Sequence, residues 1–177
     1  MTGEGLDEDF ERKVLAALSH LERRIDSLFG EVGRLKGRGL EQRVRDETRH
    51  FLRGLVAGAR TVELEDVIEN VAPGTISAEG LAALQRADLI ASGSLRSDHS
   101  TTVHLVVEVS WRIDAHDVRR ARDRAGILAK ATGQPALPAV IADDEPTADV
   151  VAVALDQGVA VVDGDGIVVS PGTVVEA

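Results

Sequence analysis

The sequence contains no cysteine, which excludes disulfide bonds and thiolate metal sites. Aromatic residues make up only 2% of the chain, so the core must be built from Val, Leu, Ile and Ala, and no aromatic surface can stack unpaired bases. No apolar run approaches the roughly 20 residues that a membrane span needs. The acidic segment 1–10 lacks the basic start and apolar stretch of a signal peptide. We therefore expect a cytoplasmic protein without a membrane partner.

Positive charge is also missing from one part of the chain. Beyond Lys130 there are eight acidic residues and neither Lys nor Arg, and the net charge of the whole chain is −10. That sign disfavours nucleic acid as a partner. The basic residues are concentrated in segments 41–60, with five Arg, and 101–130, with six basic residues. Each segment can be a solvated helix face or can flank a nucleic-acid site, and the sequence leaves both interpretations open.

The clearest pattern that is present lies near the N-terminus. Apolar residues recur there at alternating spacings of four and three, which is the a/d pattern of a coiled coil over about three heptads. The residues are Val14, Leu18, Leu21, Ile25, Leu28, Val32 and Leu35. β-Branched residues at a with Leu at d favour a parallel two-stranded coil. The pattern predicts a homodimer, and the alternative is a single helix that packs this stripe on its own domain.

After the heptads, Gly37 and Gly39 predict a linker between a coiled-coil segment 1–37 and a domain 38–177. The domain pattern predicts a helix over 40–57, an ambiguous segment 61–71, a short helix with Ser77 as N-cap that ends near 86, and strands at 87–92 and 103–111 joined by a hairpin loop. It continues with a long helix over 114–132, a strand at 136–142, a helix over 146–157 and short strands at 159–163 and 167–170 around the turn 164–166. This order predicts an α/β fold with a mixed sheet.

Two acidic residues stand on or next to the central strands. Asp88 opens the first strand, and Glu108 lies near the end of the next one. A carboxylate within an apolar strand is costly unless it is paired, hydrogen-bonded or bound to a metal. Two such groups on neighbouring strands can converge on a hard divalent cation such as Mg²⁺ or Mn²⁺. In the alternative interpretation, Asp88 caps a turn or pairs with Arg86, and Glu108 lies on a half-exposed strand face.

An acid in an N-terminal helix, then Asp88, then Glu108-Val109-Ser110 after an apolar strand and then a helix resembles the PD-(D/E)XK nuclease superfamily. The stretch 107–128 is similar to bacterial members that carry N-terminal coiled coils. The resemblance spans roughly residues 38–163 and implies a restriction-endonuclease-like αβββαβ core. It also implies Asp88, Glu108 and the Val109 carbonyl as metal ligands, Glu41 as the helical acid near the metal, and cleavage of nucleic acid, with DNA favoured over RNA.

The sequence departs from this family at Ser110, which stands where the family has its catalytic Lys. A Ser hydroxyl can hydrogen-bond a water, but it brings no positive charge to the site. Lys130 and three arginines of the following segment, Arg112, Arg119 and Arg122, are the candidates for compensation. Two functions therefore stay open: a metal-dependent nuclease, or a catalytically inactive nuclease-fold module that binds nucleic acid or protein.

The remaining polar residues carry weaker signals. His99 and His104 have no second histidine at helical spacing, and the other histidines lie on charged helices, so a histidine metal site is not predicted. Ser110 lacks the glycine elbow and the histidine partner of a nucleophile. The acids 143–145, Asp163 and Asp165 fit solvated turns and a helix start.

Overall fold

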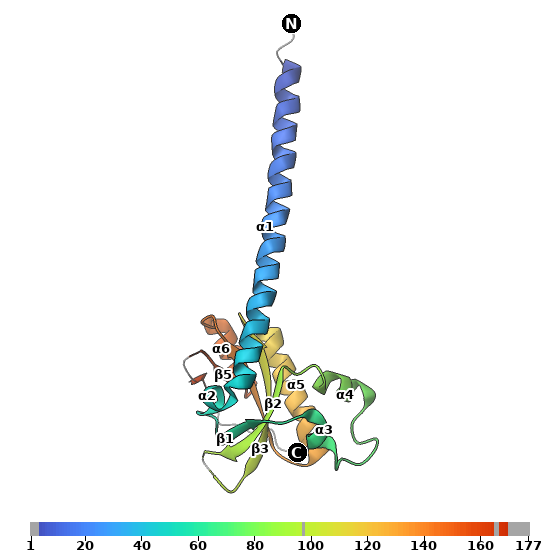
Figure 1. The fold of residues 1–177 in the computed structure, drawn as a ribbon, viewed down its shortest axis with the longest axis vertical. Helices are drawn as coiled ribbons and strands as arrows, with labels where there is room; N and C mark the ends of the chain where they lie inside the picture. The colour runs from blue at the N-terminus through green and yellow to red at the C-terminus, as the bar shows by residue number, and fades with distance from the viewer. Residues whose placement is uncertain (1–3, 97, 165–166, 170–177) are drawn as a thin grey trace. The chain divides into compact units, whose positions relative to one another are not determined.

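The computed structural model describes residues 4–96, 98–164 and 167–169 (Figure 1). The chain divides into two compact units, Met1–Lys36 and Gly37–Ala177. This division lies one residue from the boundary expected at Gly37 and Gly39. None of the helices in the described ranges combines the length and the apolar character needed to cross a membrane.

Helix α1 extends from Glu4 to Asp46, so the chain stays helical through the expected linker. The prediction that Gly37 and Gly39 interrupt the helix is therefore wrong. A glycine weakens a helix by about 1 kcal/mol relative to Ala, which the flanking residues can offset. Just after the glycines, Leu40 and Val44 are fully packed in the core of the second unit and hold this part of the helix.

The predicted helix over 40–57 extends too far toward the C-terminus. After α1 come a single-turn helix α2 (Thr48–Leu52) and the first strand, β1 (Val56–Thr61). Gly58 does not stop a helix: it has a φ of +65° within β1, where the register with the neighbouring strand shifts between Ala57 and Arg60. A left-handed residue of this kind is typical of a β-bulge and favours glycine.

The described strands form one mixed sheet in the order β1-β2-β3-β4-β5-β6. The other strands are β2 (Leu89–Leu95), β3 (Thr102–Ser110), β4 (Ala136–Ala142), β5 (Ala160–Val162) and β6 (Ile167–Val169). Pairs β1/β2, β2/β3 and β5/β6 are antiparallel, whereas β3/β4 and β4/β5 are parallel. The expected α/β class with a mixed sheet is confirmed, as is the hairpin between β2 and β3. The turn at 165–166 lies outside the described residues.

Four further helices connect the strands: α3 (Leu64–Ile68), α4 (Ala78–Leu84), α5 (Ala115–Thr132) and α6 (Ala148–Asp156). Their ends follow local chemistry. The Ser77 hydroxyl accepts a hydrogen bond from the Gly80 amide, as the N-cap prediction requires. Asp114 and Asp117 form a reciprocal capping box at the start of α5, and Gly133 ends that helix with a left-handed φ of 67°.

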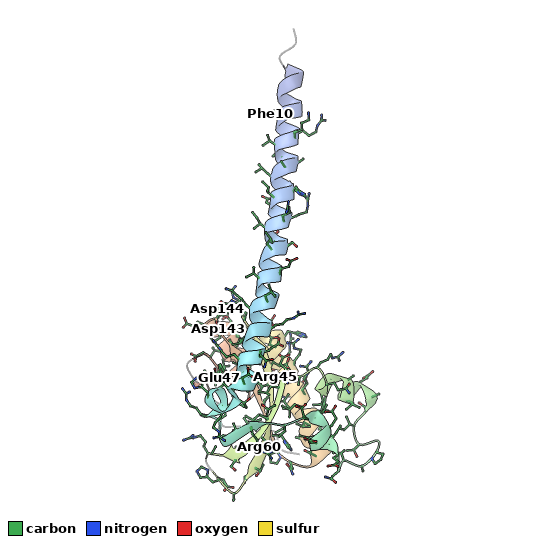
Figure 2. The ribbon with its side chains drawn as sticks, viewed as in Figure 1. Phe10, Arg45, Glu47, Arg60, Asp143 and Asp144 are labelled. Carbon is green, nitrogen blue, oxygen red and sulfur yellow. The ribbon has the colours of Figure 1, made fainter. Side chains whose placement is uncertain are left out.

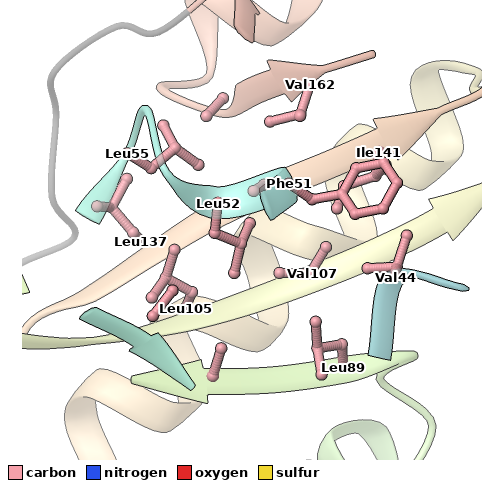
Figure 3. Packing of buried hydrophobic residues seen from close by; sticks show 14 of the residues in the cluster. Val44, Phe51, Leu52, Leu55, Leu89, Leu105, Val107, Leu137, Ile141 and Val162 are labelled. Carbon is pink, nitrogen blue, oxygen red and sulfur yellow. The ribbon is translucent and has the colours of Figure 1, made fainter. Parts of the chain in front are cut away.

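Apolar side chains cover both faces of the sheet. On one face, Val44, Phe51 and Leu52 from α1 and α2 pack on Val107 and Ile141 of the central strands (Figure 3). The other face packs against α3, α4 and α5, and further along the sheet against α6. Because both faces are covered, the polar side chains of the central strands must find partners inside the domain.

Candidate functional site

Glu108 is a buried carboxylate on the sheet face that α5 covers. Along β3 it shares this face with His104 and Val106, because side chains alternate across a strand, and Val106 packs against α5 residues such as Leu128. The Glu108 residue is only 1% exposed. The interpretation of Glu108 as a solvated strand residue is therefore wrong: the following helix, α5, lies over the face that would otherwise be exposed.

Two arginines of α5 neutralise this carboxylate. Nη1 of Arg124 donates to Oε1 of Glu108, and Nη2 of Arg120 lies 3.1 Å from Oε2. Arg124 is itself buried, and Arg120 also pairs with Asp117 at 2.5 Å. Both oxygens of Glu108 are thus bound by guanidinium groups from one helix. An ion pair of this kind holds its geometry firmly, although burial offsets much of its net contribution to stability.

Asp88 lies beside this pair, just before β2. Its Oδ2 accepts a hydrogen bond of 2.8 Å from the backbone amide of Val109, and its own carbonyl accepts one from Nη2 of Arg45. The contact with Val109 joins Asp88 to β3 next to Glu108, so the two predicted acids do lie together. The contacts of Asp88 run to Val109 and Arg45 and not to Arg86, the alternative partner proposed from sequence.

The pKa values show that the predicted acids affect one another. Burial raises the pKa of Glu108 to about 7, the charge of Asp88 adds to this, and Arg124 opposes it. Burial also raises the pKa of Asp88, against the hydrogen bond from Val109. The pKa of Glu41, on α1, is raised first by its burial and next by Asp88. The charge of Asp88 thus acts on both Glu41 and Glu108.

Ser110 and two of the cations expected to replace the missing Lys, Arg112 and Arg119, make other contacts. The Ser110 hydroxyl donates to the carbonyl of Arg112 at 2.9 Å. Arg112 pairs with Asp144 at 2.9 Å, and Nε of Arg119 donates to the Ala115 carbonyl. The cations that reach the acidic cluster are instead Arg120 and Arg124, which sequence reasoning missed. Their spacing of four, in step with the buried positions of α5, is the signal that places both on the sheet side of the helix.

The arrangement does not fit a divalent cation on Asp88, Glu108 and the Val109 carbonyl. Both Glu108 oxygens are engaged by guanidinium groups, and one Asp88 oxygen accepts an amide hydrogen. Within residues 4–96, 98–164 and 167–169, no three or more His, Cys, Asp or Glu side chains form a group that could hold a metal ion. The metal site implied by the resemblance stays a prediction that the donor geometry does not support.

Comparisons with family models, with curated proteins and with solved structures give no match to this chain. The functional conclusions therefore depend on the sequence and the geometry of the site alone.

Proposed function

We propose that the protein is a homodimeric interaction module, in which α1 forms a parallel two-stranded coiled coil and the α/β domain is a restriction-endonuclease-like fold that does not hydrolyse nucleic acid. The observation that carries this proposal is the apolar seam of α1, defined as the seven a and d residues of its heptads. They are Val14, Leu18, Leu21, Ile25, Leu28, Val32 and Leu35, and each is between 40% and 68% exposed in the single chain.

The seam is where the described chain exposes most of its large apolar side chains. Nine of the ten large hydrophobic residues that are exposed lie on α1, and the tenth is Leu155. The nine include Phe10, drawn on α1 in Figure 2. Full burial of one such side chain contributes roughly 1.5–3 kcal/mol. A contiguous exposed stripe of this size is typical of an interaction surface.

The residues beside the seam favour a second copy of the same chain in parallel orientation. In a parallel dimer, each g residue faces the e residue of the next heptad in the partner. Glu31 at g then faces Lys36 of the second copy, an attractive pair, and Phe10 at g faces Leu15 of the second copy, an apolar pair. Both pairs occur twice by symmetry, so the register that buries the seam also matches its flanks.

The order and direction of the elements support the nuclease-like fold. A helix leads into three antiparallel strands, β1, β2 and β3, and α5 then connects β3 to the parallel strand β4. Apart from the short helices α3 and α4, which lie between β1 and β2, this is the αβββαβ order that the resemblance implies. The acids also stand where the resemblance expects them, with Asp88 beside β2 and Glu108 near the end of β3.

The arginine contacts favour the inactive form of that fold. A hydrolytic site needs carboxylate oxygens that are available to a cation, and Glu108 already has both of its oxygens in ion pairs with Arg120 and Arg124. Ser110 brings no positive charge to replace the family's Lys. We therefore propose that the domain is the catalytically inactive form of the fold.

The same contacts favour protein over nucleic acid as the partner. Phosphate binding needs free guanidinium or ammonium groups, but several arginines of the basic segments are used within the domain. Arg43 pairs with Asp143, Arg112 pairs with Asp144, and Arg45 donates to the Asp88 carbonyl; Arg45, Asp143 and Asp144 are labelled in Figure 2. The acids 143 and 144, expected as solvated turn residues, thus neutralise part of the basic charge.

The proposal is tested by placing one charge in the seam and the same charge next to it. In Leu28→Glu, a carboxylate occupies a d position and should dissociate the dimer, because two buried negative charges would face each other. Ser27→Glu, on the neighbouring exposed position, is the matched control and should remain dimeric. Light scattering coupled to size exclusion reads the molar mass of each. Equal masses for the two variants and the unmodified protein would contradict the proposal.

Hydrolysis is tested separately with purified protein, plasmid DNA and Mg²⁺ or Mn²⁺. We expect no cleavage. Metal-dependent cleavage that disappears in both Asp88→Ala and Glu108→Ala would show an active nuclease and overturn the inactive assignment without affecting the dimer.

A further inference from the structure

A cavity of about 590 Å³ lies in the domain at the opposite end of the sheet face from the acidic cluster. The cavity is lined by residues at the end of β1, in α3 and the segment after it, in the middle of β2, at the start of β3 and at the C-terminal end of α5. Its volume is within the range of pockets that enclose small organic molecules. Nothing in the proposed function accounts for it.

Three polar side chains form a row across one wall of the cavity. Arg60 of β1 is the register partner of Ser92 of β2, and Ser92 is the register partner of His104 of β3. Residues paired across strands project to the same face of a sheet, so the row presents a guanidinium, a hydroxyl and an imidazole side by side. Ser92 is 4% exposed and His104 is 9% exposed, so both polar groups are held inside the domain.

One member of this row has hydrogen-bonding capacity that a ligand can reach. Nδ1 of His104 has no hydrogen-bond partner among the described residues, but it is fully buried and does not open to the cavity. Arg60, labelled in Figure 2, is exposed and has no ion pair with any described residue. A guanidinium without an ion pair, beside the Ser92 hydroxyl, points to a ligand with acceptor oxygens.

The charges of the cavity define the ligand further. Burial lowers the pKa of His104, while a hydrogen bond with Gln134 acts in the opposite direction. Arg60 is therefore the full positive charge of this wall at neutral pH, and Asp66 on the opposite wall disfavours a second negative charge on the ligand. The side chains of Val62, Val67 and Ala131 add apolar surface.

We propose that this cavity binds a small monocarboxylic acid with an apolar body, with its carboxylate on Arg60 and Ser92 and its body against the valines. Arg60 can take the carboxylate in a bidentate contact, which explains the use of Arg rather than Lys. The proposal is independent of the coiled coil and of the acidic cluster.

The test uses hexanoate as the probe, with hexanamide and inorganic phosphate as comparison ligands, on the full chain. Backbone amide shifts in ¹⁵N NMR spectra are expected to follow hexanoate at Ser92, His104 and Thr132, with a Kd on the order of 1 mM for so small a ligand. Phosphate and hexanamide should bind at least about tenfold more weakly, because phosphate lacks the apolar body and hexanamide lacks the negative charge. Equal binding of phosphate, or no shifts at the cavity residues, would overturn the proposal.

Variants then connect binding to the named residues. Arg60→Gln should weaken hexanoate binding by about tenfold or more and leave hexanamide unchanged. Arg86→Gln, an exposed arginine that does not line the cavity, is the matched control and should bind like the unmodified protein. Ala131→Met, which fills the cavity without removing a polar group, should also reduce binding. Unchanged hexanoate affinity in both Arg60→Gln and Ala131→Met would contradict the assignment.

Discussion

The two units of the chain differ in the polarity of the side chains that they expose and bury. The seam of α1 leaves apolar side chains in water, with Leu35 68% exposed, whereas the α/β domain buries a carboxylate, Glu108, at 1% exposure. Each arrangement is unfavourable by itself and becomes stable with the right partner. The domain provides the partners of Glu108 from its own helix α5, but the described chain provides nothing to cover the seam. The difference teaches that the domain supplies the partners of its buried carboxylate, whereas the seam of α1 would be covered by the proposed second copy of the chain.

The largest effect on the domain is expected from breaking the buried ion pair. Arg124→Ala leaves the Glu108 carboxylate buried with one remaining cation, and removing one member of such a pair costs about 3–5 kcal/mol. Chemical denaturation monitored by circular dichroism measures this loss. The double variant Arg124→Met with Glu108→Leu is the control, because apolar groups of similar size replace both charges and should restore most of the stability. A double variant no more stable than the single one would contradict the account.

The next effect is a dependence of stability on pH. Burial and Asp88 raise the pKa of Glu108 from 4.5 to about 7 in the folded state. Between these values the folded protein binds more protons than the unfolded chain, so the free energy of unfolding falls as the pH rises through this window. A shift of this size corresponds to on the order of 3 kcal/mol. The pKa values of Asp88 and Glu41 are also raised and act with the same sign.

Denaturation curves between about pH 4.5 and pH 7 test this dependence. The variant Glu108→Gln keeps the shape of the side chain and cannot ionise, so its stability should vary less with pH than that of the unmodified protein. An identical pH profile for the two proteins would show that Glu108 does not titrate in this range.

The smallest of these effects concerns the N-cap that positions α5 and its arginines. Asp114 accepts hydrogen bonds from the amides of His116 and Asp117. Asp114→Ala should lower the free energy of unfolding by about 1 kcal/mol, the usual contribution of an N-cap. Asp114→Asn is the matched control, because Asn is also a good N-cap and should retain most of the stability. A loss equal for Ala and Asn would mean that the charge, and not the cap, is what matters.

Sequence patterns predicted much of the fold because local chemistry determined it. The strand at 136–142 matches β4, and the helix closed by Gly133 matches α5, since both have strong periodicity and clear end signals. The helix expected over 40–57 ended too late because Val56 enters the sheet as the partner of Leu95, a contact between residues far apart in the sequence. Gly37 and Gly39 were overridden in the same way by the packing of the residues that follow them.

The site was predicted in part for the same reason. Asp88 and Glu108 could be identified because a carboxylate within an apolar strand is unusual. Their partners could not, because Arg120 and Arg124 reach Glu108 only after α5 has packed on β3. Arginines on a surface helix are most often solvated, so composition gave no reason to select these two.

The parallel pairing of α1 can be tested with single cysteines because the chain contains none. Val14 lies at a d position near one end of the seam and Leu35 at a d position near the other. In a parallel dimer, Val14→Cys alone should oxidise to a covalent dimer, since equivalent d residues of the two chains face each other at a separation that permits a disulfide. Covalent dimer only in a mixture of Val14→Cys and Leu35→Cys, or none at all, would contradict the parallel coiled coil.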